Sequence, residues 1–248
     1  MMPDPATEVA RPEFKLKRVL ASAFLAGEGL DSQKVLRQVL EDWGGIYDGE
    51  VISLPVPPAA SSDIPSIVLS SRNGVLRVEL FRLRVNLSWF ARDESEANLA
   101  ELLRTFADRI AAIAEKNAAP VNRLGIVVER VAGLKDPGYV LASYFCRTEL
   151  LKGPLNNLKG FELHVHTVSA ILPDVQINNW TRIKASKEAG TEYEYVLAIQ
   201  DINTLAEERE TRRFSRDQVV SFFAAATKEF DGFLELYFPH KTQVRLNL

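Results

Sequence analysis

The order of predicted elements runs along this chain twice, and this repetition constrains the fold more than any other feature of the sequence. Each half reads as a strand, a helix, three strands and a long helix, over residues 14–117 and then over residues 121–238. An internal repeat indicates two copies of one structural unit whose apolar faces are buried together. The repetition predicts the architecture, and it says little about chemistry.

The first half begins with an apolar strand and an amphipathic helix. Asp31 is a favourable N-cap residue, and apolar residues at helical spacing follow it as far as Trp43. Gly44 and Gly45 then end the helix, and clusters of turn residues separate the segments that follow. We expect strands at residues 14–25, 51–54, 64–70 and 75–90.

The last of these strands contains a change of phase. Its apolar residues alternate in one phase up to Leu80 and in the other phase from Phe81, so a β-bulge at this pair would keep both sets on the core face. The opposite face then carries Arg77, Glu79, Arg82, Arg84, Asn86 and Ser88. Asp93 and Glu96 predict a capping box for the next helix, which ends near Asn117.

The second half repeats the scheme with a strand at residues 123–132 and a short helix that opens at Asp136 and Pro137. Three alternating strands follow, at residues 161–171, 175–187 and 192–202. Their alternation leaves one polar face, as in an antiparallel sheet with one side in water. Ser215 and Gln218 predict a second capping box, which starts the final long helix.

Together these elements predict an α+β fold, in which long helices pack across one face of a curved antiparallel sheet. The β-α-β-β-β-α order of each half resembles that of the helix-grip and TATA-binding-protein-like folds. This resemblance concerns architecture alone, because one fold hosts many functions. We expect a disordered N-terminal arm, two halves and a C-terminal tail, at residues 1–12, 13–118, 119–240 and 241–248.

Charge and cysteine content exclude several classes of protein. The 30 basic and 33 acidic residues give a net charge of -3, which excludes a generally basic nucleic-acid-binding protein. The single cysteine, Cys146, cannot form an intramolecular disulfide, so a reducing compartment and a packing role are expected. No apolar run approaches the ~20 residues that span a bilayer, and the first residues do not resemble a signal peptide. We therefore expect a cytoplasmic protein with no membrane partner.

One pattern suggests a metal site, formed by Glu162, His164 and His166. Alternate residues of a strand share a face, so these three side chains point the same way. A His-x-His pair can bind zinc or iron, and a carboxylate could complete a set of three ligands. The alternative is a polar outer strand face, which we favour because this segment supplies no further histidine or cysteine.

A second pattern suggests a nucleic-acid interface. Its candidate residues combine cations with a tryptophan that could stack on a base, and they are Arg82, Arg84, Trp180, Arg182 and Lys184. Acidic residues share the neighbourhood of these cations and would repel phosphate, namely Glu79, Glu129, Glu162, Glu192 and Glu194. On the overall charge we favour a solvated sheet face that carries ion pairs between strands.

No motif of a known catalytic mechanism occurs in the sequence, including phosphate-binding glycine loops, nucleophile elbows and Cys-x-x-Cys pairs. Glu192 and Glu194 could act as acid and base, but surface strands carry such pairs commonly. We expect no cofactor and no catalytic residue. The leading hypothesis is a non-enzymatic binding or assembly protein that recognises a protein partner through its sheet face or an edge strand. A nucleic-acid-binding protein is the alternative, and a metal-dependent enzyme is the least favoured.

Two short stretches carry a resemblance to a family. Residues 121–130, VNRLGIVVER, and residues 199–203, IQDIN, with the charged loop and helix that follow, resemble a sporadically distributed, uncharacterised bacterial family of chains of about this length. Glu129 stands where that family more usually has arginine. The resemblance implies a similar fold and a bacterial source, and a patchy distribution implies mobile or defence-associated genes.

Self-association is the last expectation. A sheet built from two halves leaves edge strands with unpaired backbone groups. Residues 64–70 contain no lysine, and we expect them to form such an edge. A homodimer would cover this edge, whereas covering loops would leave a monomer, and the sequence favours the homodimer.

Overall fold

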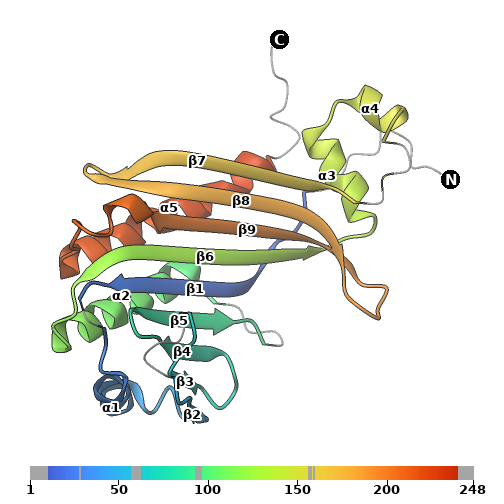
Figure 1. The fold of residues 1–248 in the computed structure, drawn as a ribbon. Coiled ribbons are helices and arrows are strands. Elements are labelled where there is room, and N and C mark those ends of the chain that lie inside the picture. Colours follow the sequence, from blue (N-terminus) through green and yellow to red (C-terminus); the bar gives the residue numbers. More distant parts are fainter. Residues whose placement is uncertain are drawn as a thin grey trace.

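The structure is a computed structural model, and it describes residues 11–27, 29–56, 63–92, 97–155, 158 and 160–239. In this part of the chain, nine strands form one open antiparallel sheet, and helices accompany it (Figure 1). The predicted α+β class and the antiparallel sheet are confirmed. No helix among the described residues is long and apolar enough to cross a membrane.

The first half contains five strands and two helices. They are β1 (Lys15–Leu25), α1 (Ser32–Trp43), β2 (Val51–Ser53), β3 (Ile67–Ser70), β4 (Leu76–Leu80), β5 (Arg84–Phe90) and α2 (Leu99–Lys116). The second half contains four strands, three α-helices and one 3-10 turn. They are β6 (Val121–Gly133), α3 (Pro137–Phe145), α4 (Thr148–Lys152), β7 (Glu162–Leu172), β8 (Val175–Lys187), β9 (Glu194–Thr204), η1 (Ala206–Glu208) and α5 (Arg216–Tyr237).

The strands lie in the order β2-β3-β4-β5-β1-β6-β9-β8-β7. At the centre, β1 and β6 run antiparallel, with Val19 opposite Val128 and Ser22 opposite Gly125. On either side of this central pair lies the last strand of each half, β5 next to β1 and β9 next to β6. The two halves are therefore continuous parts of one sheet.

The predicted long strand over residues 75–90 is wrong. The structure divides it into β4 and β5, which pair as a hairpin with Arg77 opposite Ser88 and Leu80 opposite Val85. The backbone amide of Phe81 donates to the carbonyl oxygen of Arg84 at 2.8 Å and closes the turn. A tight turn changes the phase of apolar alternation just as a bulge does, so the pattern at residues 80–81 fits both. The first half consequently has one more strand than the second.

The predicted sheet edge at residues 64–70 is also wrong. Strand β3 covers residues 67–70 and pairs with β2 on one side and with β4 on the other. The outer strands of the described sheet are β2 and β7. Strand order follows from tertiary pairing, which a single sequence does not reveal.

Local capping signals explain most of the helix boundaries. The Asp31 carboxylate accepts hydrogen bonds from two backbone amides of α1, and Ser215 with Gln218 forms the predicted capping box of α5. The N-cap of α2 is Asn98, whose side chain accepts from the amide of Glu101 at 3.1 Å. The predicted cap at Asp93, with Glu96, lies outside the described residues. So do residues 1–10 of the predicted arm and the whole predicted tail.

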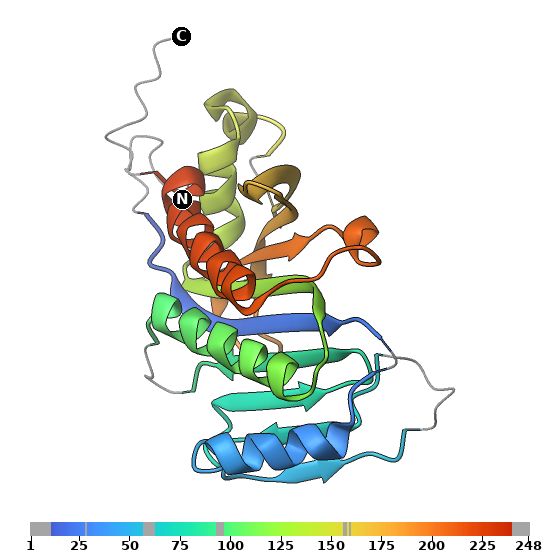
Figure 2. The same ribbon diagram turned by 90° about the vertical axis from the view of Figure 1, so that its left-hand side faces the viewer.

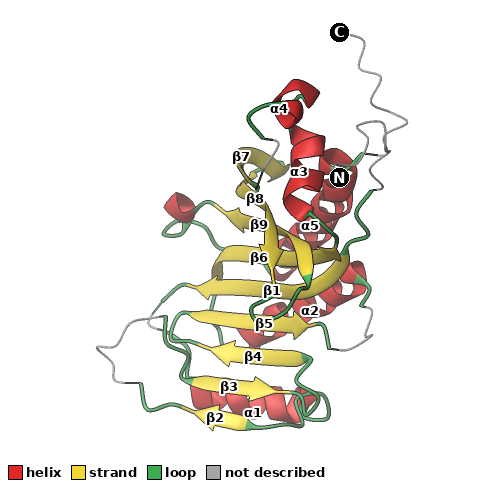
Figure 3. Cartoon of the chain, turned by 90° about the vertical axis from the view of Figure 1, so that its right-hand side faces the viewer, coloured by secondary structure: helices red, strands yellow, loops and turns green. Residues whose placement is uncertain are grey.

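The helices α1, α2, α3 and α5 lie on one side of the sheet, and the other side is open (Figures 2 and 3). The sequence causes this arrangement, because strand residues such as Val19 and Ala21 are fully buried while Leu20 and Ser22, which alternate with them, remain partly accessible. On the helix side, Phe106 and Phe222 are fully buried in a core that spans both halves. The 3-10 turn η1 projects on the open side (Figure 3).

Candidate binding face

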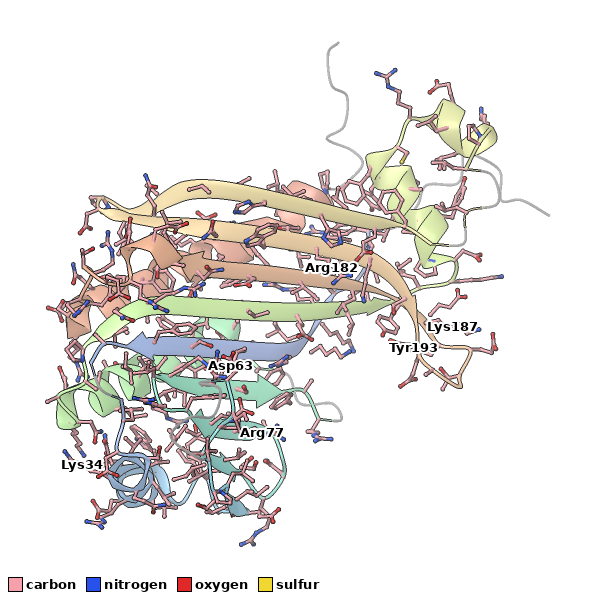
Figure 4. The ribbon with its side chains drawn as sticks, in the orientation of Figure 1. Lys34, Asp63, Arg77, Arg182, Lys187 and Tyr193 are labelled. Atoms are coloured by element: carbon pink, nitrogen blue, oxygen red, sulfur yellow. The ribbon has the colours of Figure 1, made fainter. Side chains whose placement is uncertain are left out.

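The candidate site is the open face, which we define as the strand side chains that point away from the helices. Alternation places them there, as in β8, where Trp180 is accessible and Thr181 is buried. The members that carry charge or aromatic rings include Arg18, Phe24, Arg77, Glu79, Arg84, Phe90, Arg123, Glu129, Glu162, His164, His166, Trp180, Arg182, Lys184 and Asp201. In Figure 4, the labelled Arg77 and Arg182 lie far apart across this face.

Ion pairs hold several arginines of the open face in place. Arg18 on β1 donates to Glu129 on β6 at 3.2 Å, and the two residues are directly opposite in the register. Arg84 lies 3.5 Å from the carboxylate of Asp63, while Arg77 pairs more loosely with Glu79 at 3.9 Å. Exposed pairs of this kind contribute little to stability, ~0–1 kcal/mol each. Their main effect here is to hold the guanidinium groups in place with their charge balanced.

Aromatic rings also contact the guanidinium groups of this face. Phe90 lies between Arg18 and Arg77, whose guanidinium carbons are 5.6 and 5.3 Å from the ring centroid. Phe24 lies between Arg84 and Arg123, at 5.5 and 4.9 Å. Stacking on a ring and pairing with an acid restrict the rotamers of an arginine, so this face presents cations in fixed positions.

Trp180 and His166 form a stacked pair near the outer edge of the sheet. They are directly opposite on β8 and β7, with ring centroids 3.8 Å apart and an angle of 5° between the planes. His166 Nε2 also makes a hydrogen bond with the side-chain oxygen of Asn178 at 2.9 Å. Trp180 nevertheless remains 47% exposed, which makes it one of the few large apolar side chains with free surface on this face.

Asp201 lies beside this pair, directly opposite Trp180 on the neighbouring strand β9. Burial raises the pKa of the Asp201 carboxyl above its ordinary value, while the hydrogen bond from Asn203 and the charge of Arg123 act in the lowering direction. Asn203 in turn accepts a hydrogen bond from Arg123 at 2.9 Å. A carboxylate partly withdrawn from water next to an exposed indole can accept a donor or a cation from a partner.

The structure separates the residues of the predicted nucleic-acid interface into two groups. Trp180, Arg182 and Lys184 alternate along β8, whereas Arg84 lies on β5 and Arg82 lies in the turn before it. Three strands separate β5 from β8, which corresponds to about 19 Å at the usual strand spacing. The two groups therefore belong to different regions of the open face.

The predicted metal ligands lie on one face of β7, as the alternation requires. Glu162 and His164 are neighbours, with an oxygen and Nε2 3.0 Å apart, and the same carboxylate oxygen accepts a short hydrogen bond from Arg182. His166 instead stacks on Trp180. These bonds lower the pKa of the Glu162 carboxyl, chiefly the bond from Arg182 and then that from His164. Among the described residues, no group of three or more potential ligands comes together.

Phe24, Arg123 and Asp201 belong to this face, and sequence reasoning missed them. They come from β1, β6 and β9, which are neighbours in the sheet but are far apart along the chain. Alternation within each strand could have assigned each residue to a face. Their proximity depends on strand order, for which the sequence has no signal.

A search of protein-family models finds no match to this chain, and neither does a search of curated proteins. The resemblance to a bacterial family therefore stays an expectation from the sequence.

Proposed function

We propose that this chain is a non-enzymatic binding protein that recognises a protein partner through the open face of its sheet. The observation that carries this proposal is the asymmetry of the layers. Helices cover one face completely enough to bury the core, while the other face keeps its arginines and aromatic rings in fixed, accessible positions. A surface ordered in this way loses little conformational entropy when a partner binds.

The charge balance of the open face favours a protein over a nucleic acid. Arg18, Arg84 and Arg182 each already pair with a carboxylate, so phosphate groups would have to displace Glu129, Asp63 or Glu162. Protein interfaces, by contrast, are enriched in tryptophan and arginine, both of which are present here in accessible positions.

Affinity capture from a lysate of the source organism tests this proposal. The bait is the full chain, and the open-face variants are Trp180→Ser and Arg18→Glu. Lys34→Glu provides the matched control, because Lys34 is exposed on α1 on the helix side. We expect a specific partner that both open-face variants lose and that the control retains. Equal capture by all four baits would refute the proposal.

Nucleic-acid binding is the second candidate, and the accessible Trp180 beside Arg182 and Lys184 is the observation that favours it. A base could stack on the indole while the two cations neutralise phosphates. Titration of a labelled oligothymidine into the full chain tests this candidate by fluorescence anisotropy. A nucleic-acid-binding function predicts that the oligothymidine binds, that this binding weakens steeply as the salt concentration rises, and that Trp180→Ser abolishes it. Absence of binding at low salt would remove it.

We also infer that the two halves derive from one unit, in a TATA-binding-protein-like order. Three features support this inference: the first strand of each half pairs with its last strand, the two first strands pair with each other, and a long helix ends each half. In this interpretation, β2 is an addition to the first half. A crystal structure tests this inference by superposition of β1, β3–β5 and α2 on β6–β9 and α5. A common backbone path would agree with the inference, and different backbone paths would contradict it.

The proposed assembly is a homodimer formed through β7, the longer of the two outer strands. It pairs only with β8 among the described strands, and its eleven residues include no proline, lysine or arginine that would discourage pairing. Antiparallel pairing about Thr167 would place Leu163 opposite Ile171 of the second copy and Val165 opposite Ser169. This register brings no like charges together and joins the open faces of both copies.

A cysteine at position 167 tests this register directly. In a Cys146→Ser background, Thr167→Cys should form an intermolecular disulfide under mild oxidation, because directly opposite Cα atoms lie ~4.5–5.5 Å apart. Val165→Cys is the matched control. In the proposed register, residue 165 of one copy lies opposite residue 169 of the other, so the two introduced cysteines would be too far apart to form a disulfide. Cross-linking of both variants, or of neither, would contradict the proposed pairing.

A further inference from the structure

A second candidate site lies on the helix side, away from the open face. It is a hollow of about 410 Å³ over the outer surface of α2, between α1 and the start of α5. Its lining comprises Trp43, Arg104, Thr105, Asp108, Arg109, Ala112 and Arg216. Small-molecule sites typically measure ~300–1,000 Å³, so the hollow is large enough for a small ligand.

Arg109 is the unusual member of this lining. It is only 8% exposed, and its Nη1 donates to the hydroxyl oxygen of Tyr47 at 2.8 Å. The guanidinium also faces the rings of Trp43 and Tyr47, with its carbon 5.5 and 5.4 Å from their centroids. In the part of the chain that the structure describes, no carboxylate forms an ion pair with it.

A buried guanidinium without an anionic partner is costly, because a phenol and two rings compensate only part of its lost hydration. Among the described residues, Arg130 is the other buried arginine. Arg130, however, belongs to the core and donates to the carbonyl oxygen of Phe230. Arg109 borders a hollow, so an anion from outside can supply the missing charge.

The surroundings of Arg109 are also positive. Arg104 is exposed on the turn of α2 before it, and Arg216 is the first residue of α5. The N-terminus of a helix carries partial positive charge from its free amides. Asp108 is the opposing group in the lining, and it lies 3.9 Å from Arg216, which pairs more closely with Glu115 at 2.8 Å.

We propose that this hollow binds a small organic phosphate, with the phosphate between Arg104 and Arg109 and the organic part against Trp43. Two guanidinium groups match the charge and the geometry of a phosphate better than those of a single carboxylate. The indole ring provides an apolar surface for a flat substituent. This site is independent of the open face and of any partner bound there.

Calorimetric titration of the full chain with phenyl phosphate tests the proposal, with inorganic phosphate, benzoate and phenol as comparison ligands. We expect phenyl phosphate to bind most tightly, benzoate more weakly and phenol not at all. Arg104→Gln should weaken binding roughly tenfold, the usual effect of losing one charge-assisted hydrogen bond. Arg37→Gln removes an equal charge from the exposed face of α1, outside the hollow, and should leave the affinity unchanged.

Asp108→Asn gives the result that a merely structural role would not produce. It removes the carboxylate that opposes the anion, so it should tighten phenyl phosphate binding while Arg104→Gln weakens it. Arg109→Gln should abolish binding, and circular dichroism checks that this variant folds. If it does not fold, the opposed changes of Arg104→Gln and Asp108→Asn still decide the question. No heat of binding at millimolar phenyl phosphate, or equal effects of Arg104→Gln and Arg37→Gln, would overturn the proposal.

Discussion

At the scale of single residues, the open face is ordered by pairs of unlike side chains. Arginines lie against phenylalanines and carboxylates, and Trp180 lies against His166. The pairs of Arg18 with Phe90 and of Arg123 with Phe24 join strands that are neighbours only in the folded sheet. The sequence shows the members of these pairs, and alternation assigns them to a face, but it does not show which members meet.

Asp201 provides a prediction about pH. Its pKa is raised by burial, so the folded state binds its proton more tightly than the unfolded state does. The contribution of Asp201 to stability is therefore largest below its unfolded pKa, and it falls as pH rises through the raised value. Asp201→Asn should remove this fall, so the variant should gain stability relative to the wild type as pH rises from about 4 to neutrality.

Urea denaturation of both proteins across this range measures the difference between them. Glu162 and Asp48 make stability change with pH in the opposite direction, because their hydrogen bonds lower their pKa values. Both proteins contain these two residues, so the comparison cancels their contribution. A difference in unfolding free energy that does not change with pH would show that Asp201 is not withdrawn from water.

At the scale of elements, capping residues and apolar periodicity explain the success of the sequence predictions. Predicted and observed starts agree for α1 and α5, because the capping residues Asp31 and Ser215 stand next to the helices that they cap. The start of α3 also agrees, at Pro137, although the side chain of Asp136 makes no capping hydrogen bond. The strands of the second half agree within about two residues. The hairpin at Phe81 failed as a prediction, because the change of phase at this point contains no glycine, asparagine or proline to mark a turn.

The capping box of α5 yields a quantitative prediction. Ser215 accepts from the amide of Gln218 at 3.3 Å, and the Gln218 side chain accepts from the amide of Ser215 at 2.9 Å. Ser215→Ala should lower the free energy of unfolding by about 1 kcal/mol, whereas Ser215→Asp should keep the cap. Thermal unfolding of the three proteins measures this effect. Equal losses for both variants would indicate that the site tolerates no substitution, irrespective of capping.

At the scale of the whole molecule, the central pairing of β1 with β6 makes one core from two halves. The main cluster of buried residues includes Leu103 from the first half and Phe222 from the second. A molecule built this way should unfold as one unit although its sequence reads as two. The sequence predicts one sheet from both halves, but the pairing of β1 with β6 at its centre could not be predicted, because the repeat describes each half and does not describe their contact.

Phe222→Ala tests this continuity. The side chain is fully buried in the second half, and its removal should cost about 3–5 kcal/mol. In a background with Trp43→Phe and Trp180→Phe, the fluorescence of Trp89 reports the first half alone. We expect Phe222→Ala to lower the unfolding midpoint measured by Trp89 fluorescence as much as it lowers the midpoint measured by circular dichroism. A Trp89 transition that stays unchanged would show that the halves unfold separately.

The central claim is that the open face is the working surface of this protein. Oxidative footprinting of the complex, captured with the full chain, tests this claim most directly. Trp180 is accessible on the open face, while Leu40 on α1 and Leu236 on α5 are accessible on the helix side. The account predicts that partner binding protects Trp180 from oxidation and leaves Leu40 and Leu236 unchanged. Protection of the two leucines with no change at Trp180 would contradict it.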